Sequence, residues 1–375
     1  MRLAQSVNSS SLLLPEGTYI YKLEPIGPNL AIISSDDSLR VLDPETLDLS
    51  TTIKESHDGV TCLASRDNIL FTAGRDGHIR CWDCRTGGKS MQIKNGSPAG
   101  FLSLATSHQN PLVAAGTELA NAQAIVQIWD PRAYKQPLTE YVESHSDDIT
   151  QVDLEQNSET SETSINSTKL AFHPTQASCL VSGSTDGLVN CYNIDISDED
   201  DALVQVMNHG ASVAHASFLS TQQVYALSHD EILAIYNLNG PSDLGGDRPP
   251  LLFGDMRPKA SCEYIVGLYP FKEGAVLGAG SHSQRRLDLI SLAGKEWALN
   301  KDHMIRIADA HGGDIVRSFY IDEFETVFTA GEDGFVRVWK APGEGTAQNR
   351  LKRAKSSEKH PPHKRSRKAD FRNLA

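Results

Sequence analysis

The 375-residue sequence lacks any run of 18 apolar residues, which excludes a membrane-spanning helix. Its first residues, Met1 to Ser11, are too polar for the apolar stretch of a secretory signal. Cysteine is scarce, and six residues at irregular spacing fit reduced thiols inside a cell. With 39% hydrophobic and 22% charged residues, the chain can bury one large core or two ordinary ones. These features predict a soluble intracellular protein.

Enzyme motifs are also missing. The sequence contains no GxGxxG, no phosphate-binding loop, no HExxH and no GxSxG. Cys81 and Cys84 form a CxxC, but Cys81 falls in an expected strand, and no second cysteine pair follows at a zinc-binding spacing. We therefore expect no enzyme, no metal and no cofactor.

Positive charge is scarce outside one segment. Lys+Arg total 35 and Asp+Glu total 48, which gives a net charge of −13. Residues 346–375 hold ten Lys/Arg and two Asp/Glu, so the rest of the chain carries −21. Because an acidic body repels phosphates, we expect no direct nucleic-acid binding by this body and instead a basic protein partner. Solubility is the alternative explanation of the same charge.

The sequence does contain a repeat, which is clearest in residues 56–83, 180–193 and 311–339. Each copy has an apolar strand that ends in a small hydroxyl residue, followed by an Asp-Gly turn. A second strand then alternates in period two up to an aromatic residue. Asp-Gly permits the positive φ of a tight hairpin, and the alternation turns one face of each strand inward.

The recurring His, Ser/Thr, Asp and Trp resemble the structural tetrad of WD40 repeats, a hydrogen-bonded chain from a surface loop to a buried indole. The resemblance implies three sets: His57, Thr72, Asp76 and Trp82; His145, Ser182, Asp186 and Tyr192; and His311, Thr329, Asp333 and Trp339. These histidines are also candidates for acid–base chemistry, but we interpret them as structural.

Weaker copies fill the gaps and bring the total to seven units. We therefore predict an all-β fold, a seven-bladed WD40 β-propeller over residues 1–345, because radial closure removes exposed sheet edges. The blades are expected near 19–43, 57–83, 99–130, 145–193, 209–237, 262–292 and 311–339, and a disordered basic tail over 346–375. Residues around Leu3–Val7 or Leu12–Leu14 are expected to supply the missing last strand.

Several stretches indicate a narrower relationship. HSDDITQV at 145–152, VSGSTDGLVN at 181–190, DEDDALV at 198–204, SHDE at 228–231, VRSF at 316–319 and AGED at 330–333 resemble the WD repeat-containing protein 89 family. The resemblance is collinear over residues 20–345, and the chain departs from it by a Ser/Thr/Glu-rich insertion at 155–167 and by its own tail. It implies a non-catalytic repeat protein without a settled biochemical role.

Two WDxR boxes follow successive repeats, at residues 82–85 and 129–132. They resemble the box with which some propellers dock on the large adaptor of cullin-based ubiquitin ligases. That resemblance implies Arg85 and Arg132 as docking residues. The alternative is that each arginine only caps a turn.

The tail has the spacing of a bipartite nuclear localisation signal. Its two basic clusters are Lys352 and Arg353, and then Lys364, Arg365, Arg367 and Lys368. A spacer of ten residues lets an extended chain reach two acidic pockets of an import receptor. We therefore expect a nuclear protein with room for a cytoplasmic pool. A loose nucleic-acid arm and a solubilising tail are the alternatives.

A propeller without a catalytic set offers its faces for binding. In WD40 proteins, residues just before the turn Asp and just after the leading His line the narrower face. Here they are Ser35, Asp58, Arg75, Asp147, Thr185, His229 and Glu332. We predict a non-enzymatic scaffold that binds protein partners on this acidic face, for example as a carrier of a basic nuclear client. The alternative is a substrate receptor of a cullin-based ubiquitin ligase.

Overall fold

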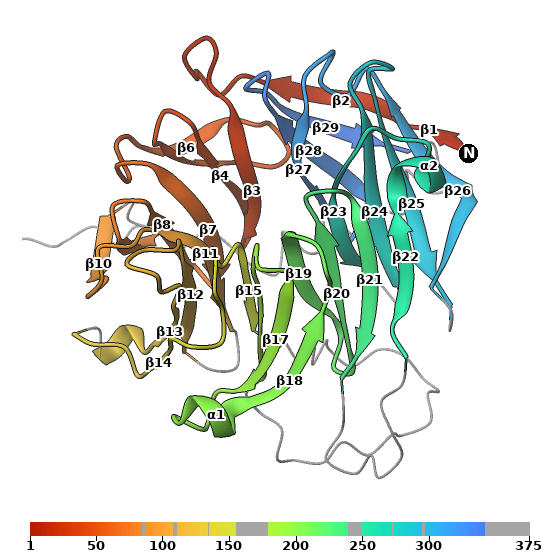
Figure 1. The fold of residues 1–375 in the computed structure, drawn as a ribbon. Coiled ribbons are helices and arrows are strands. Elements are labelled where there is room, and N and C mark those ends of the chain that lie inside the picture. Colours follow the sequence, from red (N-terminus) through yellow and green to blue (C-terminus); the bar gives the residue numbers. More distant parts are fainter. Residues whose placement is uncertain are drawn as a thin grey trace, which may run out of the picture.

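The computed structural model describes residues 1–84, 88–107, 111–133, 135–154, 179–238, 249–271, 274–294 and 297–341. Arg85, the insertion at 155–167 and the basic tail at 346–375 lie outside these residues. The described chain forms seven sheets around a common axis, which confirms the predicted all-β, seven-bladed propeller (Figure 1).

Each blade has four antiparallel strands, to which blade VI adds a fifth, parallel one, and the first strand of each blade lies nearest the axis (Figure 1). Blade I contains β3 (Ile20–Ile26), β4 (Asn29–Ser34), β5 (Leu39–Leu42) and β6 (Leu49–Ile53). Blade II contains β7 (Val60–Arg66), β8 (Ile69–Gly74), β9 (His78–Asp83) and β10 (Gly88–Lys94). Blade III contains β11 (Phe101–Thr106), β12 (Val113–Thr117), β13 (Val126–Trp129) and β14 (Thr139–Tyr141). Blade IV contains β15 (Gln151–Leu154), β16 (Cys179–Gly183), β17 (Leu188–Asn193) and β18 (Leu203–Asn208).

The second half of the ring repeats this order. Blade V contains β19 (Val213–Ser220), β20 (Gln223–Ser228), β21 (Ile232–Asn237) and β22 (Leu251–Asp255). Blade VI contains β23 (Tyr264–Phe271), β24 (Gly274–Ser281), β25 (Arg286–Ala293) and β26 (Ala298–Ala308). Blade VII contains β27 (Val316–Ile321), β28 (Thr326–Gly331) and β29 (Val336–Lys340). The expected blade ranges cover the three inner strands almost completely. In blades I to VI, the outer strand follows in the segment between two ranges, whereas the outer strand of blade VII comes from the N-terminus.

The N-terminal segment closes the ring. β2 (Gln5–Ser10) pairs antiparallel with β29 as the fourth strand of blade VII, from Gln5 opposite Lys340 to Ser10 opposite Val336. β1 (Arg2–Leu3) adds a parallel strand to β26, so the N-terminus lies beside blade VI (Figure 1). Leu12 does not join a strand; its side chain is 2% exposed in the core between blades VII and I.

Seven apolar clusters form the core, one between each pair of neighbouring blades. Phe71 of blade II, for example, packs with Phe101 and Trp129 of blade III. Phe328 of blade VII packs with Ile32 of blade I. Because a single sheet cannot cover its own faces, each blade is stabilised by its two neighbours, and the ring is stable only when all seven interfaces form.

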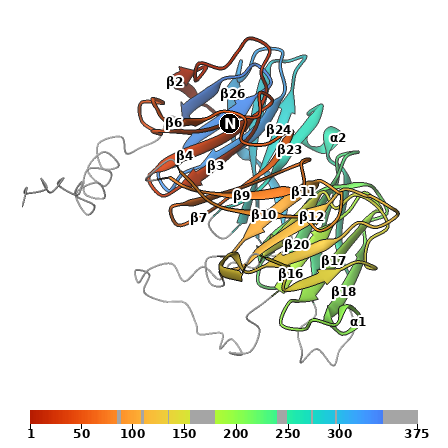
Figure 2. The same cartoon turned by 90° about the vertical axis from the view of Figure 1, so that its left-hand side faces the viewer.

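Helices are short and peripheral. α1 (Glu199–Ala202) lies beside β18, and the Glu199 carboxylate accepts hydrogen bonds from the backbone N–H groups of residues 142–144 (Figures 1 and 2). α2 (Met256–Ala260) leads from blade V to blade VI, and a 3₁₀ turn covers Pro131–Ala133. In the described part of the chain, no helix has the length and apolarity needed to cross a membrane.

Candidate protein-binding face

The first tetrad ties the outer loop of blade II to its core. The Trp82 indole N–H donates to the Thr72 hydroxyl at 2.8 Å, and Thr72 lies 2.8 Å from Nε2 of His57. Nδ1 of His57 lies 3.0 Å from the Asp76 carboxylate. Donors and acceptors alternate along this chain when His57 carries its proton on Nδ1. The Asp-Gly turn at the surface is thereby fixed to a buried indole.

The other two expected tetrads have the same connectivity. In blade VII, the distances are 2.9 Å for Trp339–Thr329, 2.8 Å for Thr329–His311 and 2.7 Å for His311–Asp333. In blade IV, His145 lies 2.6 Å from the Ser182 hydroxyl and 3.0 Å from Asp186. The Ser182 hydroxyl lies 3.2 Å from the Tyr192 hydroxyl, so tyrosine takes the place of tryptophan.

These chains contain hydroxyl, imidazole and carboxylate groups in the order of a serine-hydrolase triad, but they are closed to substrate. Thr72, Ser182 and Thr329 have no exposed surface. Burial lowers the pKa of His57 and His311, despite the nearby carboxylates, so both are neutral near pH 7. Burial disfavours the charge of Asp76, but hydrogen bonds from His57 and Arg80 outweigh it and lower its pKa to about 2. The arrangement stabilises loops and does not deliver a nucleophile.

The four blades without a complete tetrad use other polar contacts at the corresponding place. Blade I joins Asp36 to Ser34, Ser38 and Arg40; blade III joins Gln127 to Asn95; blade V joins His209 to Tyr236; and blade VI joins Asp288 to Arg306. In blade V, the Nδ1 atom of His209 lies 3.0 Å from the tyrosine hydroxyl. Every blade therefore has side-chain polar contacts at this place, although in blade VI they join two strands, β25 and β26, and not a loop.

The loops between the second and third strands of each blade share one face with the loops that lead into the first strands. We call it the upper face. On it, the backbone N–H of the residue before the turn donates to a carbonyl of the leading loop. The donors are Ser35, Arg75, Glu118, Thr185, His229 and Glu332, at 2.8–3.0 Å. Five of these six are residues expected on the binding face, and their backbones are held in equivalent positions around the ring.

The upper face has excess negative charge at its rim. Its arginines are engaged: Arg75 pairs with Glu118 at 3.2 Å, Arg285 with Asp309 at 2.7 Å, and Arg317 with Glu332. Four further carboxylates of the rim form no ion pair with residues in the described ranges: Asp58, Asp147, Asp230 and Asp314. Three of them, Asp58, Asp230 and Asp314, are exposed. A surface of this kind attracts cationic groups.

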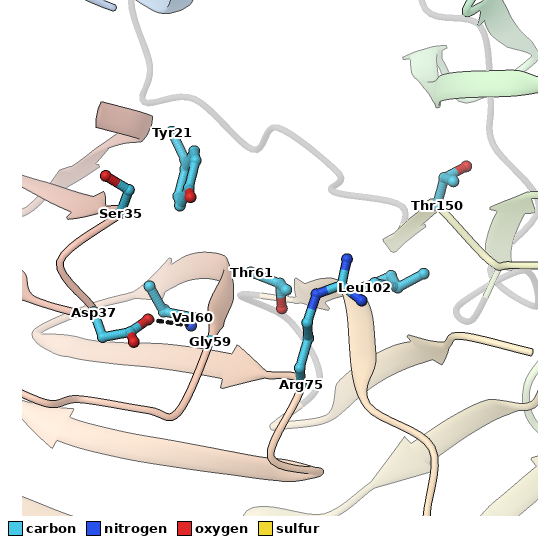
Figure 3. A pocket seen from close by; sticks show the side chains of 9 residues that line it. All are labelled: Tyr21, Ser35, Asp37, Gly59, Val60, Thr61, Arg75, Leu102 and Thr150. Atoms are coloured by element: carbon cyan, nitrogen blue, oxygen red, sulfur yellow. Dashed lines mark hydrogen bonds between the residues drawn. The ribbon is translucent and has the colours of Figure 1, made fainter. Parts of the chain in front are cut away.

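A hollow of about 560 Å³ lies on the upper face and is lined by residues of blades I, II, III and IV (Figure 3). It is lined by Tyr21, Ser35, Asp37, Gly59, Val60, Thr61, Arg75, Leu102 and Thr150. Only Ser35 and Arg75 were expected on the binding face. Tyr21, Thr61 and Leu102 are the extra residues of β-bulges near the start of β3, β7 and β11. In a sequence, such a bulge is indicated only by a break in the alternation of buried and exposed residues along a strand. In β7, for example, Cys62 and Leu63 are consecutive and both buried.

Of the two WDxR arginines, Arg132 lies in the 3₁₀ turn after β13, with its side chain 72% exposed. Its guanidinium forms a bidentate pair with Asp130, two residues earlier, at 2.7–3.1 Å. Arg85 lies outside the described residues. This turn is on the face opposite the upper face, because it follows the third strand of blade III.

Comparison with known proteins agrees with this architecture. The family described as WD domain, G-beta repeat matches residues 48–83. The chain is 32% identical over 314 residues to an uncharacterized WD repeat-containing protein of Saccharomyces cerevisiae, covering 82% of this chain and 74% of that protein. A second uncharacterized WD repeat-containing protein, from Schizosaccharomyces pombe, is 28% identical over 86% of this chain and 95% of its own length.

The blade topology and these matches define the class: the chain belongs to the WD-repeat proteins. Within that class, it is related to the WD repeat-containing protein 89 homolog of Dictyostelium discoideum. The two are 23% identical over 326 residues, which cover 84% of this chain and 80% of that protein. The family resemblance found in the sequence is thereby confirmed.

The tetrads predict that Trp82→Phe and Trp129→Phe lower the free energy of unfolding by different amounts. Trp82 donates to Thr72, whereas the buried indole N–H of Trp129 has no hydrogen-bond partner among the described residues. Trp82→Phe should therefore lower the free energy of unfolding by about 1–2 kcal/mol more than Trp129→Phe, because it leaves a buried hydroxyl without its donor. Urea denaturation of both variants measures the difference. Equal losses would show that the hydrogen bond contributes nothing beyond ring packing.

Proposed function

We propose that this protein is a non-enzymatic scaffold whose upper face binds a basic segment of a protein partner. The observation that carries the proposal is the charge arrangement of that face. Its arginines are paired, and its rim aspartates Asp58, Asp147, Asp230 and Asp314 form no ion pair with any residue that the structure describes. The loops that hold these aspartates make repeated backbone hydrogen bonds. A rigid surface loses little conformational entropy on binding.

Electrostatic complementarity speeds association and excludes partners of the wrong charge. The body of the chain carries −21 once the basic residues 346–375 are set apart, so the long-range field also favours a cationic partner. A carrier or scaffold for a basic nuclear client is the concrete form of this function. The same field disfavours direct binding of nucleic acid by the propeller.

Charge reversal on the upper face tests the proposal. The variant Asp58→Lys, Asp147→Lys, Glu332→Lys should recover at least about tenfold less of a basic partner than wild type when both are affinity-purified at moderate salt, because the face then repels cations. Added salt should release the partner from wild type.

The matched control reverses three exposed carboxylates away from the upper face: Asp48→Lys, Glu323→Lys and Asp200→Lys. It makes the same change in net charge, so it should retain the partner if the upper face is the binding site. Equal loss from both triple variants would point to net charge alone. Retention of the partner by the upper-face variant would contradict the proposal.

A second function, receptor for a cullin-based ubiquitin ligase, is favoured by the position of Arg132 on an exposed turn. Arg132→Ala should abolish capture of the large ligase adaptor and leave the fold intact, because the exposed side chain forms hydrogen bonds only with Asp130 among the residues described. Arg257→Ala is a matched control, since Arg257 makes the same bidentate pair with Asp255, two residues earlier. If the adaptor binds neither wild type nor variant, the ligase function is excluded.

We further propose nuclear import through the tail, with Lys352, Arg353, Lys364, Arg365, Arg367 and Lys368 as contacts of an import receptor. In a fluorescent fusion, Lys352→Ala with Arg353→Ala should shift the protein toward the cytoplasm, because the bipartite signal loses one cluster. Lys355→Ala with Lys359→Ala removes the same charge from the spacer and should not. A similar shift with both pairs would indicate that only total charge matters.

A further inference from the structure

The hollow that residues of blades I to IV line on the upper face has a carboxylate at one end and a guanidinium, a hydrogen-bond donor, at the other. Such a pocket suits a single side chain. Figure 3 shows Asp37, Ser35 and Tyr21 on one side and Arg75 beside Leu102 on the other. We propose that this pocket holds one Lys or Arg side chain of the partner segment. The inference rests on the proposed function of the upper face and names the residue type that the face selects.

The walls suit the alkyl stem of a long basic side chain. Tyr21 is 42% exposed, and its ring borders the pocket together with Val60 and Leu102. Lysine and arginine bury their methylene groups against apolar surface while keeping the charged head in a polar environment. A tyrosine ring also attracts a cation that approaches its face.

Asp37 supplies the anionic end. One of its carboxylate oxygens, Oδ1, accepts the backbone N–H of Val60 at 2.8 Å (Figure 3). Its second oxygen has no hydrogen-bond partner in the described part of the chain, so it is available to a guanidinium or ammonium group. A charge-assisted hydrogen bond of this type is stronger than a neutral one.

Arg75 does not prevent a cation from binding. Its Nη1 lies 3.2 Å from Oε2 of Glu118, so the pair is close to neutral. The remaining N–H groups of this guanidinium can donate to backbone carbonyls of the bound segment. An acidic side chain would instead have to displace Glu118 from Arg75 and approach the Asp37 carboxylate, which repels it. The pocket therefore favours a basic residue over an acidic one.

The test combines Asp37→Asn with peptides that differ at one position. Asparagine keeps an oxygen for the Val60 N–H and tolerates the left-handed backbone of Asp37, whose φ is +57°, so the variant should fold. The probes are fluorescent Gly/Ser peptides with flanking lysines and a central arginine, citrulline or glutamate. Citrulline has nearly the shape of arginine but carries no charge.

Anisotropy titrations at low salt should show that wild type binds the arginine peptide about tenfold more tightly than the citrulline peptide. Asp37→Asn should remove most of this preference, since the effects of two groups in contact are not additive. Asp48→Asn is the control. It removes the same charge from an exposed residue away from the upper face, so it should keep the preference.

Four results would overturn the inference. Equal binding of the arginine and citrulline peptides, or an unchanged preference in Asp37→Asn, would exclude the pocket while leaving a salt-sensitive upper face intact. Tightest binding of the glutamate peptide would assign the pocket to acidic residues held by Arg75. Failure of every lysine-flanked peptide to bind wild type, even at low salt, would reject the basic-partner function as well.

Discussion

The pairing of β2 with β29 is the contact on which the rest of the molecule depends. Residues of the upper face come from loops of different blades, so their relative positions are defined only while the ring is closed. The N-terminal segment bonds to blade VII through β2 and to blade VI through β1, so it bridges two neighbours. Without it, the hydrogen-bonding edge of β29 would be exposed. The apolar core between blades VII and I would also lose the Leu12 side chain.

All blades contain polar contacts between side chains, but the chemical groups that make these contacts differ from blade to blade. Blades II, IV and VII use a histidine chain, whereas blade VI uses the Asp288–Arg306 pair, in which Asp288 is 2% exposed. A buried charge of this kind is tolerated because both carboxylate oxygens accept hydrogen bonds from the guanidinium. A blade that lacks the tetrad sequence therefore still has buried polar contacts between side chains.

The tetrads, the blade order and the ring were predictable from the sequence because their signals are local: an Asp-Gly turn and an aromatic residue six positions after the Asp. The pocket was not, since its residues come from different repeats, with Tyr21 and Asp37 in blade I, Leu102 in blade III and Thr150 in blade IV, and they meet only when the blades close. The bulges that turn Tyr21, Thr61 and Leu102 toward the pocket leave only a small break in the alternation. The Asp288–Arg306 pair joins residues that follow no repeat pattern.

Solubility and binding explain the same negative charge but differ in what they require of its arrangement. Solubility needs only net charge, and exposed carboxylates on α1, such as Asp200, serve it as well as any others. It gives no reason for the arginines of the upper face to be neutralised by Glu118, Asp309 and Glu332 while the rim aspartates have no ion-pair partner in the described part of the chain. Nor does it require an open carboxylate oxygen beside an exposed tyrosine ring in a pocket. Together these features fit a surface that excludes anions and accepts a cationic side chain.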